Sequence, residues 1–514
     1  MGHGRALIVV AALAVGGCGG GDDGVTGSSS WTAGVFPPST TFANQCASPR
    51  AGTDPTTGRP YPDTRGSTLA ENSFLRSWTN ELYLWYREVP DRDPAASSTS
   101  AYFDLLKTTA TTASGNAKDR FHFTYPTAEW VALAQSGVEA GYGVEWIVLA
   151  SRPPRQVVVA FTEPGSPASS AGLARGAQVL AVDGVDMVNA TDSASVNTLN
   201  AGLYPSAAGV SHTFSILDLG ASAPRTIAMV SANVASTPVQ NVRTIRSAGA
   251  TVGYLLFNDH IATSEALLVD AFARLASANV DDLVLDVRYN GGGYLDIASE
   301  VAYMIAGPAA TGGRTFERTI FSDKHPTRDP VTGEALVPVP FHATSLGFSG
   351  PSGQPLPALG LSRVAVLTSA GTCSASESIV NGLRGIGVQV VQVGTTTCGK
   401  PYGFYPQDNC GTTYFSIQFQ GVNDQGFGDY PDGFSPAGAA GGGGVPVPGC
   451  SVADDFTHAL GDPAEARLAA ALGYLAGQGC PAVAAAPPGG VRALSAADGT
   501  LHRSPWREIR ILRR

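Results

Sequence analysis

The sequence has 514 residues, of which 43% are hydrophobic and only 14% are charged. Its length predicts about three domains, and its apolar content is sufficient to form their cores. The 32 basic side chains are outnumbered by 42 acidic ones, for a net charge of −10. This balance argues against nucleic acid as a partner, because nucleic-acid-binding proteins carry a clustered basic face.

The first 17 residues have the pattern of an export signal. A basic start precedes the apolar run Ala6–Val15, which is too short to cross a bilayer. The segment Val15–Cys18 resembles a bacterial lipobox, and this resemblance implies lipidation of Cys18, with Gly19 favouring the outer membrane. We therefore predict a signal peptide over residues 1–17 and a lipid-anchored protein of the bacterial cell envelope, on the periplasmic face of the outer membrane. The alternative is an ordinary signal peptide with an incidental cysteine.

Six further cysteines remain once Cys18 is set aside: Cys46, Cys373, Cys398, Cys410, Cys450 and Cys480. An even number in an oxidising compartment predicts disulfide bonds, but the sequence does not choose among the possible pairings. Cys398 and Cys410 flank a short turn-rich stretch and are the pair that we weakly favour. No C-x-x-C spacing occurs, so we predict neither a structural zinc nor any other metal or cofactor.

The N-terminal part of the mature chain divides into a linker and a helical unit. Residues 18–68 are rich in Gly, Ser, Thr and Pro, which predicts a flexible linker. Residues 69–130 are predicted to form a helical unit, because Phe74, Trp78, Leu82 and Trp85 follow one another at helical spacing. We interpret this aromatic stripe as packing rather than as a ligand site. A second helix is predicted in the same unit, over Ala101–Lys107.

Residues 136–235 change character and contain short β-rich runs separated by glycine and proline. Gly165–Ala168, Ala171–Leu173 and Val182–Gly184 together make this region resemble a PDZ domain of bacterial proteases. The resemblance implies a carboxylate-binding loop, because unshielded backbone N–H groups can capture a carboxylate while the next strand pairs with an extended peptide. The alternative is a glycine-rich turn with no ligand. The predicted peptide-binding residues of this loop are Gly141, Tyr142, Gly143 and Val144.

From residue 240 to 480 strands and helices alternate, which predicts an α/β domain with a mixed sheet flanked by helices. The stretch 308–360 is predicted to be a long, mostly irregular insertion, and Thr413–Phe419 a single strand. Residues 481–514 form a low-complexity tail with a basic end, His502–Arg514. We expect this end to be solvated or disordered, with contact to anionic lipid as the alternative.

Two strand-to-turn junctions carry the candidate chemistry. The first, Asp286–Gly293, ends in three glycines whose exposed N–H groups can bind an oxyanion, and it lacks the spacing of a nucleotide-binding loop. The second is the turn before a helix that contains Ser374 and Glu377. A serine there points out of the carboxyl end of the sheet, although Ser374-x-x-Glu377 is also a helix capping box.

A serine nucleophile needs a base, and the scarcity of lysine in this chain indicates which residue supplies it. Only four of the 32 basic residues are lysines: Lys107, Lys118, Lys324 and Lys400. Lys400 alone follows a strand that we expect to neighbour the strand leading to Ser374. A lysine can accept a proton if its environment favours the neutral amine, whereas arginine stays charged.

Ser374–Glu377 followed by Gly399-Lys400, the loop Leu285–Gly292 and an upstream PDZ domain together resemble the C-terminal processing peptidases, or tail-specific proteases. The resemblance implies a serine endopeptidase that captures protein or peptide substrates by their free C-termini and needs no cofactor. Ser374 would be the nucleophile and Lys400 the general base. The oxyanion hole would use the backbone N–H of Ser374 and that of Gly291, Gly292 or Gly293.

Several alternatives remain open. Many relatives carry a glutamine four residues after the lysine, but Phe404 stands there, so the third catalytic residue is undetermined, and Gln407 would be a guess. His260, oriented by Asp259 or Asp286, is a rival base. A second function class is a catalytically inactive adaptor that binds peptides at the envelope through the same fold. A binder of small apolar molecules is a third, less favoured class.

Overall fold

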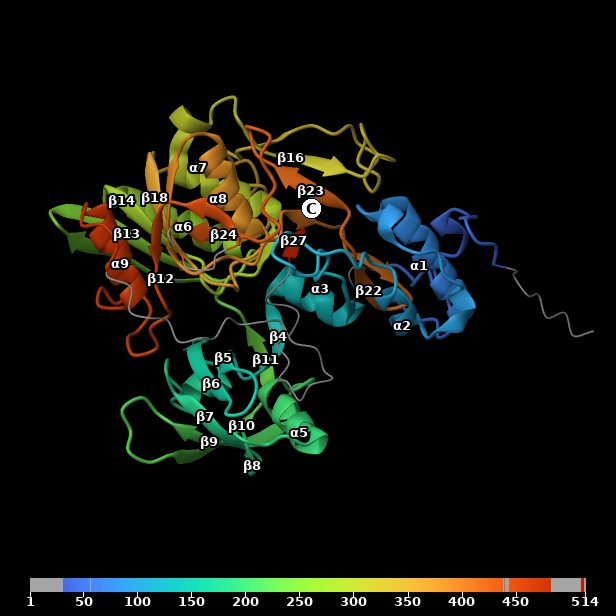
Figure 1. Ribbon diagram of the computed structural model, residues 1–514, viewed down its shortest axis with the longest axis horizontal. Coiled ribbons are helices and arrows are strands. Elements are labelled where there is room, and N and C mark those ends of the chain that lie inside the picture. The colour runs from blue at the N-terminus through green and yellow to red at the C-terminus, as the bar shows by residue number, and fades with distance from the viewer. Residues whose placement is uncertain (1–30, 56, 438, 440–442, 482–509, 513–514) are drawn as a thin grey trace, which may run out of the picture.

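The computed structural model describes residues 31–55, 57–437, 439, 443–481 and 510–512 (Figure 1). The predicted signal peptide and Cys18 lie outside the described residues. Figure 1 shows three parts: an N-terminal helical unit in blue, a small β domain in teal and green, and a larger α/β domain from green to red. Among the described residues, no helix combines the length and the apolar character needed to cross a membrane.

The N-terminal unit is built around α1, whose N-cap Ser67 accepts a hydrogen bond from the backbone of Ala70. Its predicted stripe is buried at Phe74 and Trp78, but the helix ends at Leu82, so Trp85 lies beyond it. The elements of this unit are η1 (Ser39–Thr41), β1 (Gln45–Cys46), β2 (Thr64–Arg65), α1 (Thr68–Leu82), η2 (Tyr86–Glu88), η3 (Pro94–Ala96) and α2 (Thr99–Asp104).

The predicted flexible linker over residues 18–68 is wrong for its described part, from residue 31 onward. β1 and β2 pair in parallel, and Cys46 of β1 forms a disulfide bond with Cys410 of the α/β domain. The Ser39 backbone and hydroxyl both donate to the carboxylate of Glu81 on α1. Covalent and polar contacts with distant parts of the chain therefore fold a segment whose composition alone predicts a tether.

The β domain has a sheet in the order β10-β9-β7-β6-β5, with β5 at one edge and α5 packed nearby. A two-stranded antiparallel ribbon of β4 and β11 leads into and out of it. Its elements are β4 (Val138–Gly141), β5 (Val144–Ala150), β6 (Gln156–Thr162), α4 (Pro167–Ser170), β7 (Gln178–Val182), β8 (Val185–Asp186), α5 (Ser193–Leu203), β9 (Ser211–Leu217), β10 (Arg225–Val230) and β11 (Ala232–Ala235).

The central sheet of the α/β domain has the order β12-β13-β14-β18-β19-β26. β12 is antiparallel to β13 and the other pairs are parallel, so the predicted mixed sheet is confirmed. The elements of this layer are β12 (Val239–Ser247), β13 (Ala250–Phe257), α6 (Ser264–Ser277), β14 (Asp282–Asp286), α7 (Leu295–Thr311), β18 (Arg363–Thr368), α8 (Ala375–Gly385), β19 (Gln389–Gly394), β26 (Gly449–Ser451) and α9 (Ala466–Leu475).

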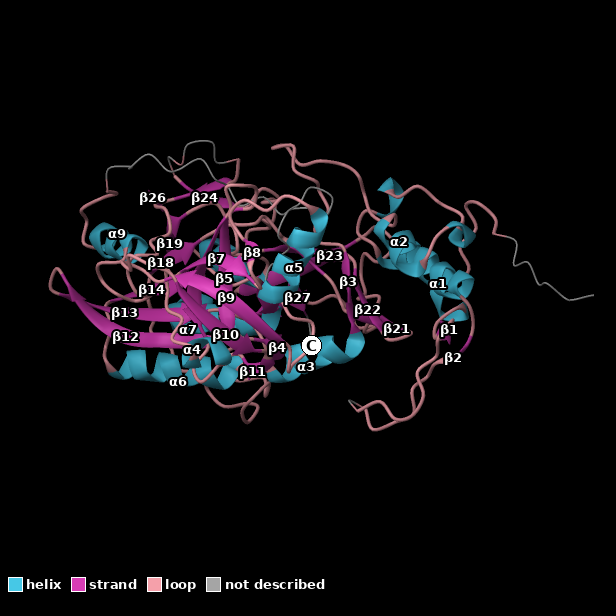
Figure 2. Cartoon of the chain, turned by 90° about the horizontal axis from the view of Figure 1, so that it is seen from below, coloured by secondary structure: helices cyan, strands magenta, loops and turns pink. Residues whose placement is uncertain are grey.

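Both faces of this sheet are covered. One face packs on α6, α7 and α8 through buried residues such as Phe272, Ile305 and Leu383. The other face packs on α9 and on the β domain, whose Val158 and Ala160 belong to the same apolar cluster. In Figure 2, α6 runs along one side of β12 and β13, while α9 lies beside β18 and β19, away from α6. The β domain is therefore packed against the sheet rather than tethered beside it.

Smaller strands complete the molecule. The predicted strand Thr413–Phe419 is in fact divided between β22 and β23, which belong to different small sheets. The predicted insertion contains β16 and β17. The remaining elements are β3 (Phe123–Pro126), α3 (Thr127–Ser136), β15 (Gly292–Tyr294), β16 (Thr315–Phe321), β17 (Val339–Pro340), β20 (Tyr402–Gly403), β21 (Gln407–Asn409), β22 (Thr412–Phe415), β23 (Phe419–Val422), β24 (Phe434–Pro436), β25 (Val445–Val447) and β27 (Arg510–Leu512).

All six predicted disulfide cysteines are paired, but the favoured pair Cys398–Cys410 is wrong. The bonds join Cys46 to Cys410, Cys373 to Cys398, and Cys450 to Cys480. Proximity along the chain was a poor guide, because Cys410 pairs with a residue 364 positions away.

Candidate active site

Four loops converge at the carboxyl edge of the parallel strands. His260 follows β13, the glycine loop follows β14, the turn with Ser374 follows β18, and the loop with Lys400 follows β19. The carboxyl ends of parallel strands share one edge of the sheet, so these loops meet in space. β18 and β19 are hydrogen-bonded neighbours, as the sequence predicted for the strands before Ser374 and Lys400.

Ser374 is the N-cap of α8 and is fully buried. Its φ of 62° and ψ of −119° are unusual for a residue other than glycine, and such strain is concentrated at functional sites. Its side chain forms a capping box with Glu377, and within the described part of the chain the hydroxyl makes no further hydrogen bond. The hydroxyl proton at the start of the helix is therefore not donated to another protein group.

Lys400 is also fully buried, and aromatic rings surround its amine. The Lys400 Nζ lies 4.1 Å from the centroid of the Phe404 ring and 5.3 Å from that of Phe121. Lys118 and Lys324 also lie over aromatic rings, but each has a polar partner: Lys118 pairs with Glu88 at 2.6 Å, and Lys324 donates to Asn80. Full burial distinguishes Lys400 from these two lysines, and its catalytic role stays a prediction.

Glu377 connects the turn of Ser374 to the loop of Lys400. Its Oε2 accepts hydrogen bonds from the backbone N–H of Ser374 at 2.9 Å and of Lys400 at 2.8 Å. Its Oε1 accepts from the Gly399 N–H at 2.8 Å and from the Thr397 hydroxyl at 2.5 Å. Burial raises the pKa of Glu377, and these four donors act in the opposite direction. One carboxylate thus fixes both candidate catalytic loops, a role that goes beyond the helix cap predicted from sequence.

A disulfide bond joins the same two loops covalently. Cys373 immediately precedes Ser374, and its partner Cys398 lies two positions before Lys400. Cys373, Glu377 and Cys398 are also the three residues whose potential metal-ligating atoms cluster among the described residues. Because the two cysteines are bonded to each other, they have no thiolate to offer a metal. These three residues instead hold the Ser374 turn and the Lys400 loop together, and we call them the structural clamp.

The predicted oxyanion donors need a correction. The Ser374 N–H donates to Glu377, and the Gly292 N–H donates to Asn290 Oδ1 at 3.0 Å, so both are engaged within the protein. Gly291 and Gly293 stay predicted donors. Gly293 has a φ of 142°, and a Cβ there would lie 2.2 Å from the His260 carbonyl oxygen, so only glycine fits.

His260 braces the glycine loop. Its Nδ1 lies 2.9 Å from Asn290 Oδ1, its backbone N–H donates to Gly292, and its carbonyl accepts from Tyr294. Burial lowers the pKa of His260 to about 3, so the imidazole is neutral at physiological pH. The alternative in which Asp286 orients His260 as the base is wrong, because the Asp286 carboxylate accepts hydrogen bonds from Tyr254 and Arg288 instead. These contacts make His260 a supporting residue of the loop.

Among the described residues, the position four residues after Lys400 is occupied by Phe404. Phe404 is buried against the amine of Lys400, and the Gln407 side chain donates to the carbonyl of Asp408 in β21. Sequence reasoning also missed Arg120, whose guanidinium donates to the carbonyl of Cys398. Arg120 therefore holds the Lys400 loop from the side of the N-terminal unit.

A buried ionic network links the β domain to the glycine loop. Arg175, between α4 and β7, donates to Asp454 Oδ1 at 2.7 Å and to the Tyr289 hydroxyl at 2.7 Å. Arg288 donates to the same Asp454 oxygen at 2.7 Å and to both carboxylate oxygens of Glu465. Burial alone would raise the pKa of Asp454, but the neighbouring arginines hold it below its usual range. Arg288 and Tyr289 lie immediately before Asn290, so the network reaches the glycine loop.

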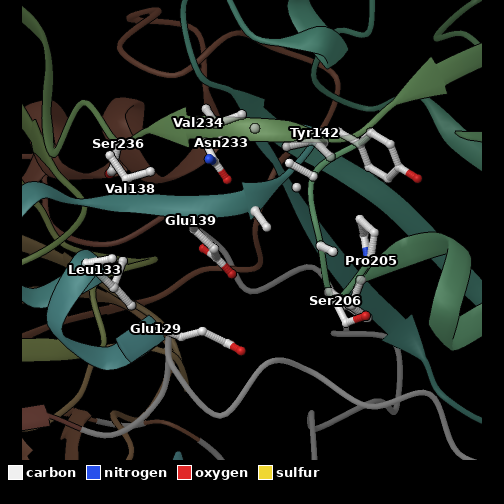
Figure 3. A pocket seen from close by; sticks show the side chains of 18 of the residues that line it. Glu129, Leu133, Val138, Glu139, Tyr142, Pro205, Ser206, Asn233, Val234 and Ser236 are labelled. Atoms are coloured by element: carbon white, nitrogen blue, oxygen red, sulfur yellow. The ribbon is translucent and has the colours of Figure 1, made fainter. Parts of the chain in front are cut away.

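A second site lies between the β domain and α3. This pocket of about 860 Å³ is lined by all four residues of the predicted carboxylate-binding loop, by β5 and by the end of α5. Figure 3 shows Glu129 and Glu139 on one side of it and Tyr142, Pro205 and Ser206 on the other. At Gly143 a Cβ would lie 2.4 Å from that of Ser166, so the loop requires glycine there. The pocket adjoins β5, whose outer edge can pair with an extended peptide.

Comparison with known proteins agrees with this organisation. Residues 251–404 match the family model of peptidase family S41, and residues 139–201 match that of the PDZ domain. A carboxyl-terminal-processing protease of Picosynechococcus is 25% identical over 274 residues, which cover 52% of this chain and 56% of that protein. One of Synechocystis is 30% identical over 139 residues, covering 27% of this chain and 31% of that protein. The chain thus spans about half or less of these relatives.

A solved structure from Bacteroides fragilis, described as a candidate S41 protease, shares the fold with a TM-score of 0.56. It is 22% identical, and the match covers 81% of this chain and 98% of that one. An α/β domain with a serine turn and a buried lysine is thus joined to a β domain that matches the PDZ model. The α/β domain is similar to peptidase family S41 over residues 251–404 and the β domain to the PDZ family over residues 139–201, as the resemblance to the C-terminal processing peptidases predicted.

Proposed function

We propose that the protein is a serine endopeptidase that captures the C-terminal tails of its substrates and cleaves them with a Ser374–Lys400 dyad. One observation carries the proposal. The turn of Ser374 and the loop of Lys400 follow adjacent parallel strands and are joined through both Glu377 and the Cys373–Cys398 disulfide bond. Such double fixation is expected where two side chains must act together.

In this mechanism Ser374 Oγ attacks the carbonyl carbon of the scissile peptide bond while its proton passes to the neutral amine of Lys400. The tetrahedral intermediate collapses as the Lys400 ammonium donates that proton to the leaving amine, which leaves an acyl-enzyme ester on Ser374. Lys400 then deprotonates a water that hydrolyses the ester and restores the serine. Gly291 and Gly293 are the proposed N–H donors to the oxyanion. Ser374 can join them only if its N–H leaves Glu377.

Substrate capture is assigned to the pocket beside the PDZ loop. The loop Gly141–Val144 offers backbone N–H groups for a terminal carboxylate, and β5 offers an edge for the chain that precedes it. Binding there would keep a substrate near the catalytic loops, which raises its effective concentration. The proposed substrates are therefore protein or peptide chains with free C-termini.

Digestion of denatured casein by purified wild-type protein and variants tests the dyad. Ser374→Ala and Lys400→Ala should each reduce cleavage by at least about 10³-fold while peptide binding by the PDZ pocket persists. Lys400→Arg should also be inactive, because arginine cannot act as a base. His260→Asn should retain measurable cleavage. Full activity of Lys400→Ala, or a loss confined to His260→Asn, would contradict the proposed dyad.

An alternative is a peptide-binding adaptor without catalysis. Two observations favour it: Phe404 stands where many relatives have a glutamine, and the Ser374 N–H is engaged by Glu377. The same casein assay separates the two functions. Absence of any product that depends on Ser374, together with intact tail binding, would favour the adaptor.

We also propose export and lipid anchoring at Cys18. The support is the apolar run, the lipobox-like segment and the three disulfide bonds, which suit an oxidising compartment. Cells labelled with a radioactive fatty acid should yield a labelled wild-type protein and an unlabelled Cys18→Ala protein. Equal labelling of both proteins would contradict the anchor.

A further inference from the structure

We infer that segment Arg510–Leu512 binds along the glycine loop of the proposed catalytic site as a substrate-like strand and competes there with substrates. The predicted competition with substrates rests on the proposed peptidase function, whereas the binding of the segment to β15 does not. β27 pairs in parallel with β15, so that Arg510 lies opposite Gly292, Ile511 opposite Gly293 and Leu512 opposite Tyr294. Figure 1 shows β27 in the middle of the molecule, between α3 and β23, next to the C label.

The position of β27 is the space that an extended peptide would need. One edge of β15 is taken by His260, which bridges to Gly293, and β27 occupies the other edge. β27 also lies beside β20, an edge strand that begins two residues after Lys400. Segment Arg510–Leu512 therefore sits between the proposed oxyanion loop and the strand that follows the proposed base.

The surrounding site is in a closed state. Ser374 and Lys400 both have an exposed fraction of 0%, although a peptidase must bring substrate to them. The Ser374 N–H, which would polarise a scissile carbonyl, is bonded to Glu377. A strand is thus present beside the glycine loop while one donor needed for cleavage is withdrawn. This combination fits an occupant that is held rather than cut.

Because the segment is part of the same chain, even a weak contact between β27 and β15 can be substantially occupied. Residues 482–509 connect the folded domain to β27 within the same chain, so the local concentration of the segment is on the order of millimolar. A contact of three paired residues with a dissociation constant near that value would leave this edge of β15 occupied about half of the time. A substrate would then have to displace the segment, which raises the apparent KM and leaves kcat unchanged.

Deletion of residues 510–514 tests the competition. We expect KM for a peptide substrate to fall about 2- to 10-fold with kcat unchanged. A matched deletion of five residues from the connecting stretch, Ala496–Thr500, keeps β27 and should leave KM as in wild type. A peptide with the sequence of residues 506–514 should inhibit the truncated protein competitively, and a scrambled peptide of the same composition should not. An unchanged KM after truncation, or equal inhibition by the scrambled peptide, overturns the inference.

A binding measurement separates this inference from the proposed function. In the Ser374→Ala background, hydrogen exchange at the Gly293 amide should be slow in the full chain and faster after deletion of residues 510–514, whereas the Tyr294 amide, which donates to the His260 carbonyl, should exchange equally in both proteins. This result would support the bound strand even if no cleavage were ever detected. Equal exchange of the Gly293 amide in both proteins overturns it. Cleavage of the segment from the chain in the wild type but not in Ser374→Ala would also overturn the inference, because the segment would then be a substrate.

Discussion

Cys373 and Cys398 are joined by a disulfide bond that ties the residue before Ser374 to the loop that carries Lys400. The Cα atoms of the two cysteines are 5.1 Å apart, and Glu377 accepts hydrogen bonds from both loops next to this bond. The relative position of the proposed nucleophile and base is therefore fixed by one covalent bond and one carboxylate. A catalytic pair loses rate steeply when its members move apart, and a misplacement of about 1 Å can cost about 10²-fold.

The double variant Cys373→Ser/Cys398→Ser should fold and still bind C-terminal peptides, but its kcat should fall about 10- to 100-fold because the two loops gain freedom. Steady-state kinetics on a peptide substrate provide the measurement. The matched control is Cys46→Ser/Cys410→Ser, which removes the bond between the N-terminal unit and the β21–β22 turn. An equal loss of kcat in both double variants would show a general effect of disulfide loss and contradict the specific clamp.

Glu377→Gln should lower kcat/KM about 10²-fold, because a glutamine offers one acceptor oxygen where four donors now converge. Its NH₂ group would face backbone N–H groups and push the Ser374 turn away from the Lys400 loop. Glu300→Gln is the matched control. Burial and the nearby Glu265 raise the pKa of Glu300 to about 9, so this side chain is already protonated at pH 7. Activity equal to wild type in Glu377→Gln would rule out the bracing role.

The sequence was sufficient to predict the parallel strands before Ser374 and Lys400, because each is a short buried apolar run followed by a turn. Their adjacency followed from the alternation of strands and helices, and β18 does pair with β19. Only one of the four hydrogen bonds that Glu377 accepts was predictable. Its bond to the Ser374 N–H is local, whereas Thr397, Gly399 and Lys400 approach it from a later strand.

Long-range pairing explains what sequence reasoning missed. The segment after residue 31 is polar and rich in turn-forming residues, and it folds because Cys46 is bonded to Cys410 and Ser39 is bonded to Glu81. The strand β27 is likewise set by a partner, β15, which lies more than two hundred positions earlier. Neither relationship leaves a periodic or compositional signal in the segment itself.

Arg175→Met should preserve tail binding but reduce kcat, because Arg175 connects the PDZ domain to Asp454 and Tyr289, next to the glycine loop. Loss of this buried cation leaves Asp454 with fewer partners and loosens the contact between the domains, and we expect about a 10-fold decrease in kcat. Peptide binding is measured by fluorescence anisotropy and kcat by steady-state kinetics. Arg225→Met is the control, since Arg225 pairs with Asp218 inside the PDZ domain. A loss of tail binding in Arg175→Met would indicate a disrupted PDZ domain instead of lost coupling.

Glu163 should make the stability of the PDZ–catalytic junction depend on pH. It follows β6, and its carboxylate accepts hydrogen bonds from the Thr237 N–H at 2.9 Å and from the Gln240 side chain at 3.3 Å. Burial, with a smaller contribution from Asp259, raises the pKa of Glu163 to about 7 from an ordinary value of 4.5. Between these two pH values the folded state binds more protons than the unfolded state. Its free energy of unfolding therefore falls as pH rises through this window.

Raising the pH from 5 to 8 should thus destabilise the wild type relative to Glu163→Gln by on the order of 2 kcal/mol, because glutamine stays neutral at both values. Thermal unfolding of both proteins at the two pH values gives the comparison, and using the difference between them removes the contribution of other titrating groups. Glu334→Gln, at an exposed position, is the control and should track the wild type. If the wild type instead gained stability relative to Glu163→Gln on going to pH 8, the change in its free energy of unfolding would have the opposite sign to the one predicted. It would show that the carboxylate is better solvated as an anion in the folded protein than its burial at the junction implies.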